Sequence, residues 1–182
     1  MESLHKLLMN RRSIRKYTNQ PLTSEQVKTI LEAALMAPAG KRKNPWQFVV
    51  VEDKETLSQL AKAKEHGANP IEGASLAVVV VCDPYLSDTW IEDGSIASIL
   101  MQLACEDLGL GSCWIQMRNR YTADGRSAEE IVRTLLGIPP HLQVLSIISI
   151  GHKAEEKNPI DTDQLQWEKV HVGQWREDIN EG

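Results

Sequence analysis

Residues 90–117 read WIEDGSIASILMQLACEDLGLGSCWIQM, and this stretch decides the fold. Apolar side chains recur at helical spacing over Trp90–Asp107, which predicts the longest helix of the chain. Gly109 follows, at the position where a left-handed glycine commonly ends a helix. Ser112–Met117 then predicts a strand. The helix is apolar over much of its circumference, so we expect it in the centre of the core or at a subunit interface.

Regular periodicity on both sides of this centre predicts the remaining elements. Capping boxes at Thr23–Gln26 and Ser127–Glu130 mark two helix starts, because each pairs a hydroxyl with a Gln or Glu three residues later. Strands are expected where short apolar runs lie between loops. Helices are predicted at residues 2–10, 24–36, 54–64 and 127–137, and strands at 47–51, 76–81 and 142–150. The residues alone indicate a three-layer α/β arrangement.

The composition is that of a single globular domain. The 182 residues are 42% hydrophobic and 25% charged, and the formal net charge is −5, which argues against general nucleic-acid binding. The longest apolar runs, at 76–82 and 144–150, are too short to span a bilayer. The chain starts directly with a helical pattern and not with a signal peptide. We therefore expect a cytoplasmic protein that binds neither membranes nor nucleic acid.

Three cysteines, Cys82, Cys105 and Cys113, lie in apolar surroundings. Their odd number and apolar neighbours indicate reduced core thiols, as expected in the cytoplasm. A catalytic cysteine is the less favoured alternative, because no base is evident near any of them. The histidines are scattered without a pair at ligand spacing, so no metal site is predicted.

Residues 152–182 are mostly polar, but large apolar residues, among them Trp167, Trp175 and Ile179, interrupt them without a regular period. Disordered segments avoid aromatic residues, and some thirty residues cannot form a core of their own. The sequence therefore predicts an arm laid across a surface. That surface belongs either to the same chain or to a partner subunit, and we favour the partner.

A basic segment near the N-terminus, Arg11-Arg12-Ser13-Ile14-Arg15-Lys16-Tyr17, has the composition of a phosphate site. Arginine offers a planar fork of donors and serine a single hydroxyl, and both are good phosphate ligands. Apolar Ile14 and Tyr17 indicate that the segment packs on the body of the protein. A solvated charged surface is the alternative. In an acidic protein, a local basic cluster favours a small anionic ligand.

Two further segments are typical of ligand loops. Pro38–Trp46 is a basic, glycine-containing loop between a helix and a strand, and Gly109–Trp114 is a glycine-rich turn whose backbone could approach a planar ligand. A Rossmann fingerprint is excluded for this turn because the third glycine is missing and the order is helix to strand. The acidic group at residues 83–93 is explained by the helix dipole. Because the sequence shows no nucleophile–base pair, P-loop or hydrolase elbow, we expect a cofactor that performs the chemistry.

Taken in order, these three segments resemble the nitroreductase family of flavin oxidoreductases. Pro45-Trp46-Gln47-Phe48 and Ile150-Gly151-His152 also keep that family's spacing. The resemblance implies an α+β fold with a mainly antiparallel central sheet flanked by helices. It further implies one FMN-binding domain at residues 1–151 and a C-terminal extension at 152–182 that wraps the partner subunit. The expected assembly is a homodimer with FMN bound between the chains.

The resemblance also implies which residues hold FMN. The phosphate and ribityl chain would contact the basic segment, the ring edge would contact Asn69, and the backbone at Leu110 and Gly111 would face the flavin N5 region. Ala39 and Arg42 stand where the family commonly has Ser and Asn. A basic residue of the tail is also expected near the phosphate. The full expected set is Arg11, Arg12, Ser13, Arg15, Pro38, Ala39, Gly40, Arg42, Asn69, Leu110, Gly111, Ser112 and Lys153, with Lys169 as the alternative to Lys153 and residues 38–42 supplied by the partner subunit.

The implied activity is reduction of a nitroaromatic, quinone or similar electron-poor acceptor with NADH or NADPH, by ping-pong hydride transfer through flavin N5. The positive charge of Lys41, Arg42 and Lys43 leads to the hypothesis that this loop favours either an anionic flavin hydroquinone or a phosphorylated donor such as NADPH. Two alternatives stay open: a flavin-binding redox sensor without turnover, and a specialised flavin reaction such as dehalogenation or flavin breakdown. A dimer without any cofactor is the least favoured possibility.

Overall fold

A four-stranded antiparallel sheet forms the centre of the protein, whose computed structural model describes residues 3–175. The strands are β1 (Trp46–Val51), β2 (Leu76–Cys82), β3 (Leu110–Gln116) and β4 (Gln143–His152), in the spatial order β1-β2-β4-β3. Every neighbouring pair is antiparallel. The α+β class with an antiparallel sheet is therefore confirmed, and the α/β arrangement expected from the residues alone is wrong.

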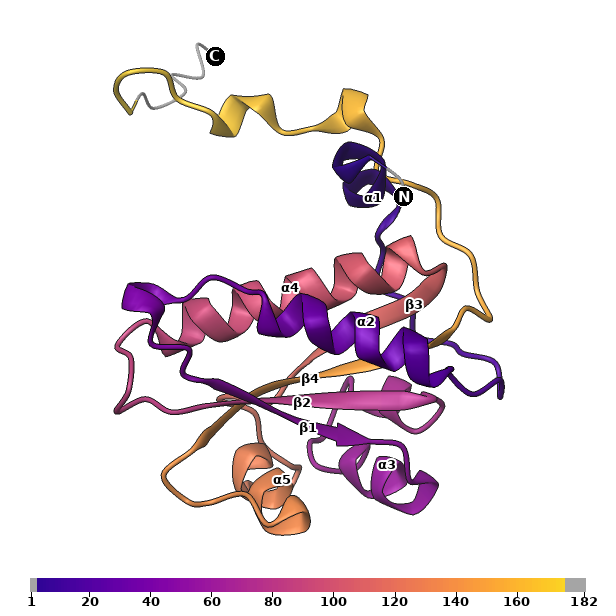
Figure 1. The fold of residues 1–182 in the computed structure, drawn as a ribbon, viewed down its shortest axis with the longest axis vertical. Helices are drawn as coiled ribbons and strands as arrows, with labels where there is room; N and C mark the ends of the chain where they lie inside the picture. The colour runs from indigo at the N-terminus through magenta and orange to yellow at the C-terminus, as the bar shows by residue number, and fades with distance from the viewer. Residues whose placement is uncertain (1–2, 176–182) are drawn as a thin grey trace.

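One face of the sheet is covered by α2 (Ser24–Leu35) and α4 (Trp90–Asp107) (Figure 1). The capping box predicted at Thr23 and Gln26 is present, with both side chains bonded to the opposite backbone amide. Ile30 of α2 and Met101 of α4 are completely buried over the central strands. The long helix is thus the core helix that the sequence predicted.

The other face is covered by α3 (Lys54–Leu60) and α5 (Ala128–Leu136) (Figure 1). Asp53 caps α3, and Ser127 caps α5 by accepting a hydrogen bond from the Glu130 amide. Apolar residues of both helices, including Leu57, Leu60 and Val132, close a second core against sheet residues such as Ile147 of β4. Two cores on opposite faces explain why β2 is buried along its whole length and β4 everywhere except at its two ends.

The chain differs from the predicted elements mainly at their ends. β3 begins at Leu110, two residues earlier than expected, because the turn at Gly109 (φ +70°) leads directly into pairing with β4. Helix α3 ends at Leu60, short of the predicted residue 64. Two expected loops contain single 3₁₀ turns, η1 (Gly40–Arg42) and η2 (Asn69–Ile71).

The N-terminal helix and the chain around residue 160 lie side by side near the α2/α4 face (Figure 1). Helix α1 (Leu4–Asn10) packs near the end of α4, and the Ile160 amide donates to the Met9 carbonyl at 2.8 Å. Beyond it the arm continues through η3 (Thr162–Gln164) and η4 (Trp167–Lys169) and extends away from the body (Figure 1). Residue 2 of the predicted first helix and Ile179 lie outside the described residues. No described helix is long and apolar enough to cross a membrane.

Candidate functional site

The basic N-terminal segment lies along the outer edge of β3. Ser13 forms a parallel bridge with Ser112, and the Ile14 amide donates to the Ser112 carbonyl at 3.0 Å. Tyr17 bridges Lys153 beyond the end of β4. The segment therefore behaves as a short extra strand, which confirms that it packs on the body and is not a free basic tail.

Two glycines make room for this packing. A Cβ on Gly111 would lie 2.6 Å from the Ile14 side chain, and a Cβ on Gly151 would lie 2.9 Å from Tyr17. Gly111 and Gly151 are also register partners in the sheet. Ile14 fills the space beside Gly111, and the Leu110 side chain is buried. The expected contact of the backbone at Leu110 and Gly111 with the flavin N5 region stays a prediction.

Strand-like alternation divides the basic segment into two sides. Arg11, Ser13 and Arg15 face the side on which Cys113 lies. Burial raises the pKa of the Cys113 thiol, whereas the charge of Arg15 and a hydrogen bond with Ser13 lower it. Two arginines and a hydroxyl thus converge on one side of the β3 edge. This is a suitable donor set for a phosphate group.

Lys64 adds a third cation that the sequence did not single out. Its Nζ donates to the Gln116 carbonyl at 2.9 Å, and its positive charge lowers the pKa of the Cys113 thiol. Burial and the neighbouring charge of Arg120 lower the pKa of Lys64. Because Ser112 points its carbonyl outward, alternation also directs the backbone groups of Trp114 and Gln116 toward the same edge. Only the three-dimensional pairing of β3 reveals this edge, since Lys64 is 52 residues from Gln116 in sequence.

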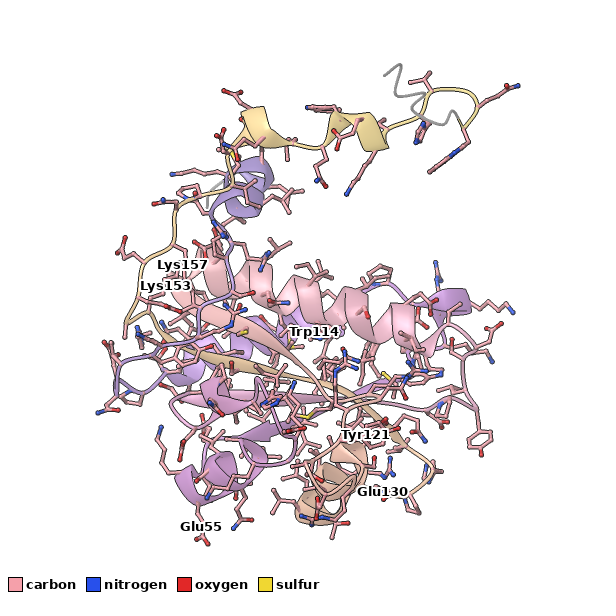
Figure 2. The ribbon with its side chains drawn as sticks, turned by 180° about the vertical axis from the view of Figure 1, so that it is seen from behind. Glu55, Trp114, Tyr121, Glu130, Lys153 and Lys157 are labelled. Atoms are coloured by element: carbon pink, nitrogen blue, oxygen red, sulfur yellow. The ribbon has the colours of Figure 1, made fainter. Side chains whose placement is uncertain are left out.

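Arg12 and Lys153 lie on the other side of the segment. The Arg12 guanidinium donates to the Asn158 carbonyl, and Lys153 Nζ lies 2.9 Å from both carboxylate oxygens of Glu106. Figure 2 shows Lys153 and Lys157 together on the strip that follows β4, separate from Trp114 of β3. Glu106 pairs with this cation within the chain, and the expected contact of Lys153 with a phosphate stays a prediction.

The basic loop after α2 lies at the opposite end of α4 from the basic segment. The Gly40 amide donates to Asp93 Oδ1 at 2.9 Å, in the first turn of α4. Lys41, Arg42 and Asn44 all adopt left-handed backbone, with φ of 51°, 55° and 47°. This conformation costs a residue with a side chain about 1 kcal/mol or more, and such outliers are often found at functional sites.

The other predicted site residues are distributed along the sheet edge and the loop. Asn69 is exposed at the start of η2, and Ser112 is buried and holds the basic segment through its carbonyl. Pro38 and Arg42 are exposed, and Ala39 and Gly40 are half-buried. The structure of one chain therefore brings Arg11, Ser13 and Arg15 together but does not join residues 38–42 to them.

The cysteines are structural. All three are buried, and burial raises the pKa of Cys82 to about 12 and also raises that of Cys105. High thiol pKa values disfavour the nucleophilic thiolate. Among the described residues there is also no group of His, Cys, Asp and Glu side chains that could hold a metal ion.

The fold is that of an α+β protein with cationic and hydroxyl side chains gathered at one edge of its sheet, and sequence comparison identifies its family. The sequence model of the nitroreductase family matches residues 8–94 and 88–152. The chain belongs to the nitroreductase family. A protein of Archaeoglobus fulgidus, whose provisional name combines NADH dehydrogenase and NAD(P)H nitroreductase, is 36% identical over 180 residues, covering 96% of this chain and 100% of that protein.

Similar proteins with solved structures agree with this assignment. A chain described as an FMN-dependent nitroreductase from Clostridium difficile superposes with a TM-score of 0.92 at 42% identity, covering 94% of this chain and 100% of that chain. The NADPH:FMN oxidoreductase of Vibrio harveyi, solved with NAD+, superposes with a TM-score of 0.78 at 26% identity, covering 95% and 78%.

Proposed function

We propose that this protein is an FMN-dependent NAD(P)H oxidoreductase that reduces nitroaromatics, quinones or similar electron-poor acceptors. The observation that carries the proposal is the convergence of Arg11, Ser13 and Arg15 on the outer edge of β3, beside Lys64. The names of the relatives, which include nitroreductases and NADPH–flavin oxidoreductases, support it.

The donor set fits FMN. Arg11 and Arg15 offer charge and paired N–H donors to a phosphate, and Ser13 offers a hydroxyl. Further along the same edge, the outward backbone groups of Trp114 and Gln116 suit the polar edge of a planar heterocycle, and Lys64 supplies positive charge there. Bound FMN would supply the hydride-transfer chemistry, and the protein would supply binding, orientation and electrostatics.

In one chain the loop of residues 38–46 and the basic segment of residues 11–17 lie near opposite ends of α4. Asp93 holds the loop at Gly40, whereas Glu106 lies in the cavity that Arg12 and Ile14 line. Asp93 and Glu106 are thirteen positions apart in α4, which corresponds to about 20 Å along the helix axis. A second copy related by a twofold axis can bring its own loop to the first copy's basic segment. We therefore infer a homodimer in which each chain completes the other's site.

Exposed apolar residues support this assembly. A groove of about 380 Å³ separates α1, α2 and α4, and its lining is mostly apolar: Leu4, Leu7, Ala33, Met36, Leu100, Leu103, Ala104 and Asp107. The arm is also exposed, with Trp167 at 67% and Val172 at 88%. Unpaired apolar surfaces of this kind mark interaction sites. A partner chain that receives the arm would cover both surfaces.

The acceptor site is proposed at the end of β3. The Arg118 guanidinium lies 5.5 Å from the Trp90 ring centroid, and Tyr121 is exposed nearby in sequence. Aromatic and cationic side chains suit a flat, electron-poor acceptor. These groups would bind and orient it, and solvent could supply protons.

The visible absorbance spectrum tests the function. We expect the purified protein, or the protein incubated with FMN, to show flavin bands that bleach within seconds of adding NADH or NADPH without oxygen. Bands that do not bleach would favour the redox-sensor alternative. Absence of bound flavin after incubation would contradict the proposed site.

The preference between donors has its own test. Lys41 and Lys43 line a cavity of about 210 Å³ with Ser87 and Thr89, so we expect the basic loop to favour NADPH. Replacing both lysines with Gln should lower the NADPH/NADH ratio of kcat/KM several-fold. Lys28→Gln, at an exposed position of α2, should leave this ratio unchanged. An unchanged ratio in the double variant would remove this part of the proposal.

A further inference from the structure

We propose that Asp93 is a positioning residue that fixes the loop of residues 39–44 in the geometry needed at the cofactor site. This inference rests on the proposed function, because it assumes that the loop contacts FMN. The sequence explained Asp93 by the helix dipole alone. The structure shows a different role, since the carboxylate faces the loop and not solvent.

Asp93 is only 3% exposed, although it is charged. Its Oδ1 accepts the Gly40 amide at 2.9 Å, and its Oδ2 accepts the Ser87 and Thr89 hydroxyls at 3.0 and 3.1 Å. A buried charge is tolerated only when hydrogen bonds satisfy it. Here the carboxylate links three segments: the loop, the turn before α4 and α4 itself.

The loop needs such an anchor because its backbone is strained. Three of its residues, Lys41, Arg42 and Asn44, carry positive φ, and none of them is glycine. The Gly40 amide is bonded to Asp93 at the start of this strained stretch. Removing the carboxylate should destabilise this loop conformation, because strained backbone conformations persist only when surrounding contacts hold them in place.

The fit around Gly40 is close. A Cβ at this position would lie 2.5 Å from Thr89 Oγ1 and 3.8 Å from Asp93 Oδ2. The anchor can therefore be disturbed from either side: by removing the carboxylate, or by adding a methyl group that pushes the loop away. Both changes should have the same effect on the cofactor if the loop position is what matters.

The test compares Asp93→Ala, Asp93→Asn and Gly40→Ala with the wild type. We expect Asp93→Ala and Gly40→Ala to weaken FMN binding about tenfold and to reduce the increase in Tm that FMN causes. Asp93→Asn keeps one acceptor oxygen, so it should rescue part of the affinity. The bound flavin should also change its visible spectrum in both alanine variants.

Ser98→Ala is the matched control. Ser98 is a buried polar residue of the same helix, and its hydroxyl donates to the Gly94 carbonyl at 2.7 Å and not to the loop. It should lower the Tm of the free and FMN-loaded protein equally and leave FMN affinity unchanged. The same behaviour in Asp93→Ala would overturn the proposal, because Asp93 would then be merely structural.

Amide hydrogen exchange separates this inference from the proposed function. Asp93→Ala should increase exchange at residues 40–44 of the protein without added FMN, and unchanged exchange would contradict the anchor. If the wild type fails to bind FMN, the proposed function fails, and the role claimed for Asp93 at the cofactor site fails with it. If Asp93→Ala does not fold, Gly40→Ala tests the same loop position by FMN affinity and amide exchange while the Asp93 carboxylate is kept.

Discussion

The two faces of the sheet differ in how completely the chain covers them. On the face covered by α3 and α5, helix residues such as Leu60 and Val132 are completely buried. On the α2/α4 face the core is also closed, but the outer surfaces of the helices leave Met36 75% exposed and Ile96 37% exposed. The chain itself covers the apolar residues of the first face. The second face leaves apolar side chains exposed, as a surface that binds another subunit does. Stability and assembly should therefore respond to different mutations.

The largest effect is expected in the closed core. Leu60→Ala should lower the free energy of unfolding by about 3 kcal/mol, because it leaves a cavity among fully buried side chains. For a chain of this size, that corresponds to a fall in Tm of roughly 6–12 °C. Thermal unfolding and light scattering check the prediction together. A variant that loses dimerisation while keeping its Tm would contradict the distinction between the faces.

A charge in the open groove should act on assembly instead. Met36→Asp should weaken dimerisation at least tenfold, about 1.4 kcal/mol, because it places a carboxylate in an apolar interface. Its effect on the thermal stability of the isolated chain should be small, since Met36 is mostly exposed. Sedimentation equilibrium measures the association. Thr134→Asp, an exposed position on α5, is the control, and equal weakening by both variants would contradict the interface.

The basic edge should control cofactor affinity. Arg15→Gln removes a charge from the group that faces Cys113 and should weaken FMN binding about tenfold. Arg12→Gln, on the opposite side of the same segment, should weaken it less, because Arg12 is bonded to the Asn158 carbonyl. Fluorescence titration with FMN measures both. Equal losses would show that the two sides of the segment are not distinct.

The smallest effect concerns the strip after β4. Glu155 accepts the Arg15 amide at 2.6 Å, and this bond, with the nearby Lys157, lowers the pKa of the Glu155 carboxyl. Because its pKa is lower in the folded state, the stabilisation is present above the ordinary carboxyl pKa and is lost as pH falls through the folded value. The protection factors of the amides at residues 153–160, which are corrected for the intrinsic pH dependence of exchange, should therefore fall on acidification.

Glu155→Gln should show these lower protection factors already at neutral pH, and its protection factors should depend much less on pH. Glu156→Gln is the control at the adjacent position. The prediction would be wrong if both variants kept the same acid transition as the wild type.

The sequence was sufficient to predict where helices and strands lie along the chain, but not which strands pair in the sheet. The periodicity of residues 90–107 and the caps at Thr23 and Ser127 are local signals, so α2, α4 and α5 could be predicted closely. The antiparallel order of the sheet came only from family resemblance, because strand pairing depends on contacts between distant residues.

The candidate site shows the same limit. The basic segment could be recognised from composition, but not its division into two sides, which follows from its pairing with Ser112. Gly111 suggested a ligand contact, whereas its missing side chain makes room for Ile14. Lys64 carried no local signal at all, and Lys153 gave no indication that Glu106 would pair with it. The roles of the FMN-binding residues and the crossing of the arm to a partner stay predictions.

The measurement that tests the account most directly is the mass of the purified, FMN-loaded protein by light scattering, with flavin absorbance recorded on the same peak. We expect twice the chain mass of 20.4 kDa with one FMN per chain. In the proposed dimer, a second copy covers the α2/α4 face and brings its loop of residues 38–46 to the basic segment of the first. A single-chain particle that binds FMN with full affinity would contradict the shared site.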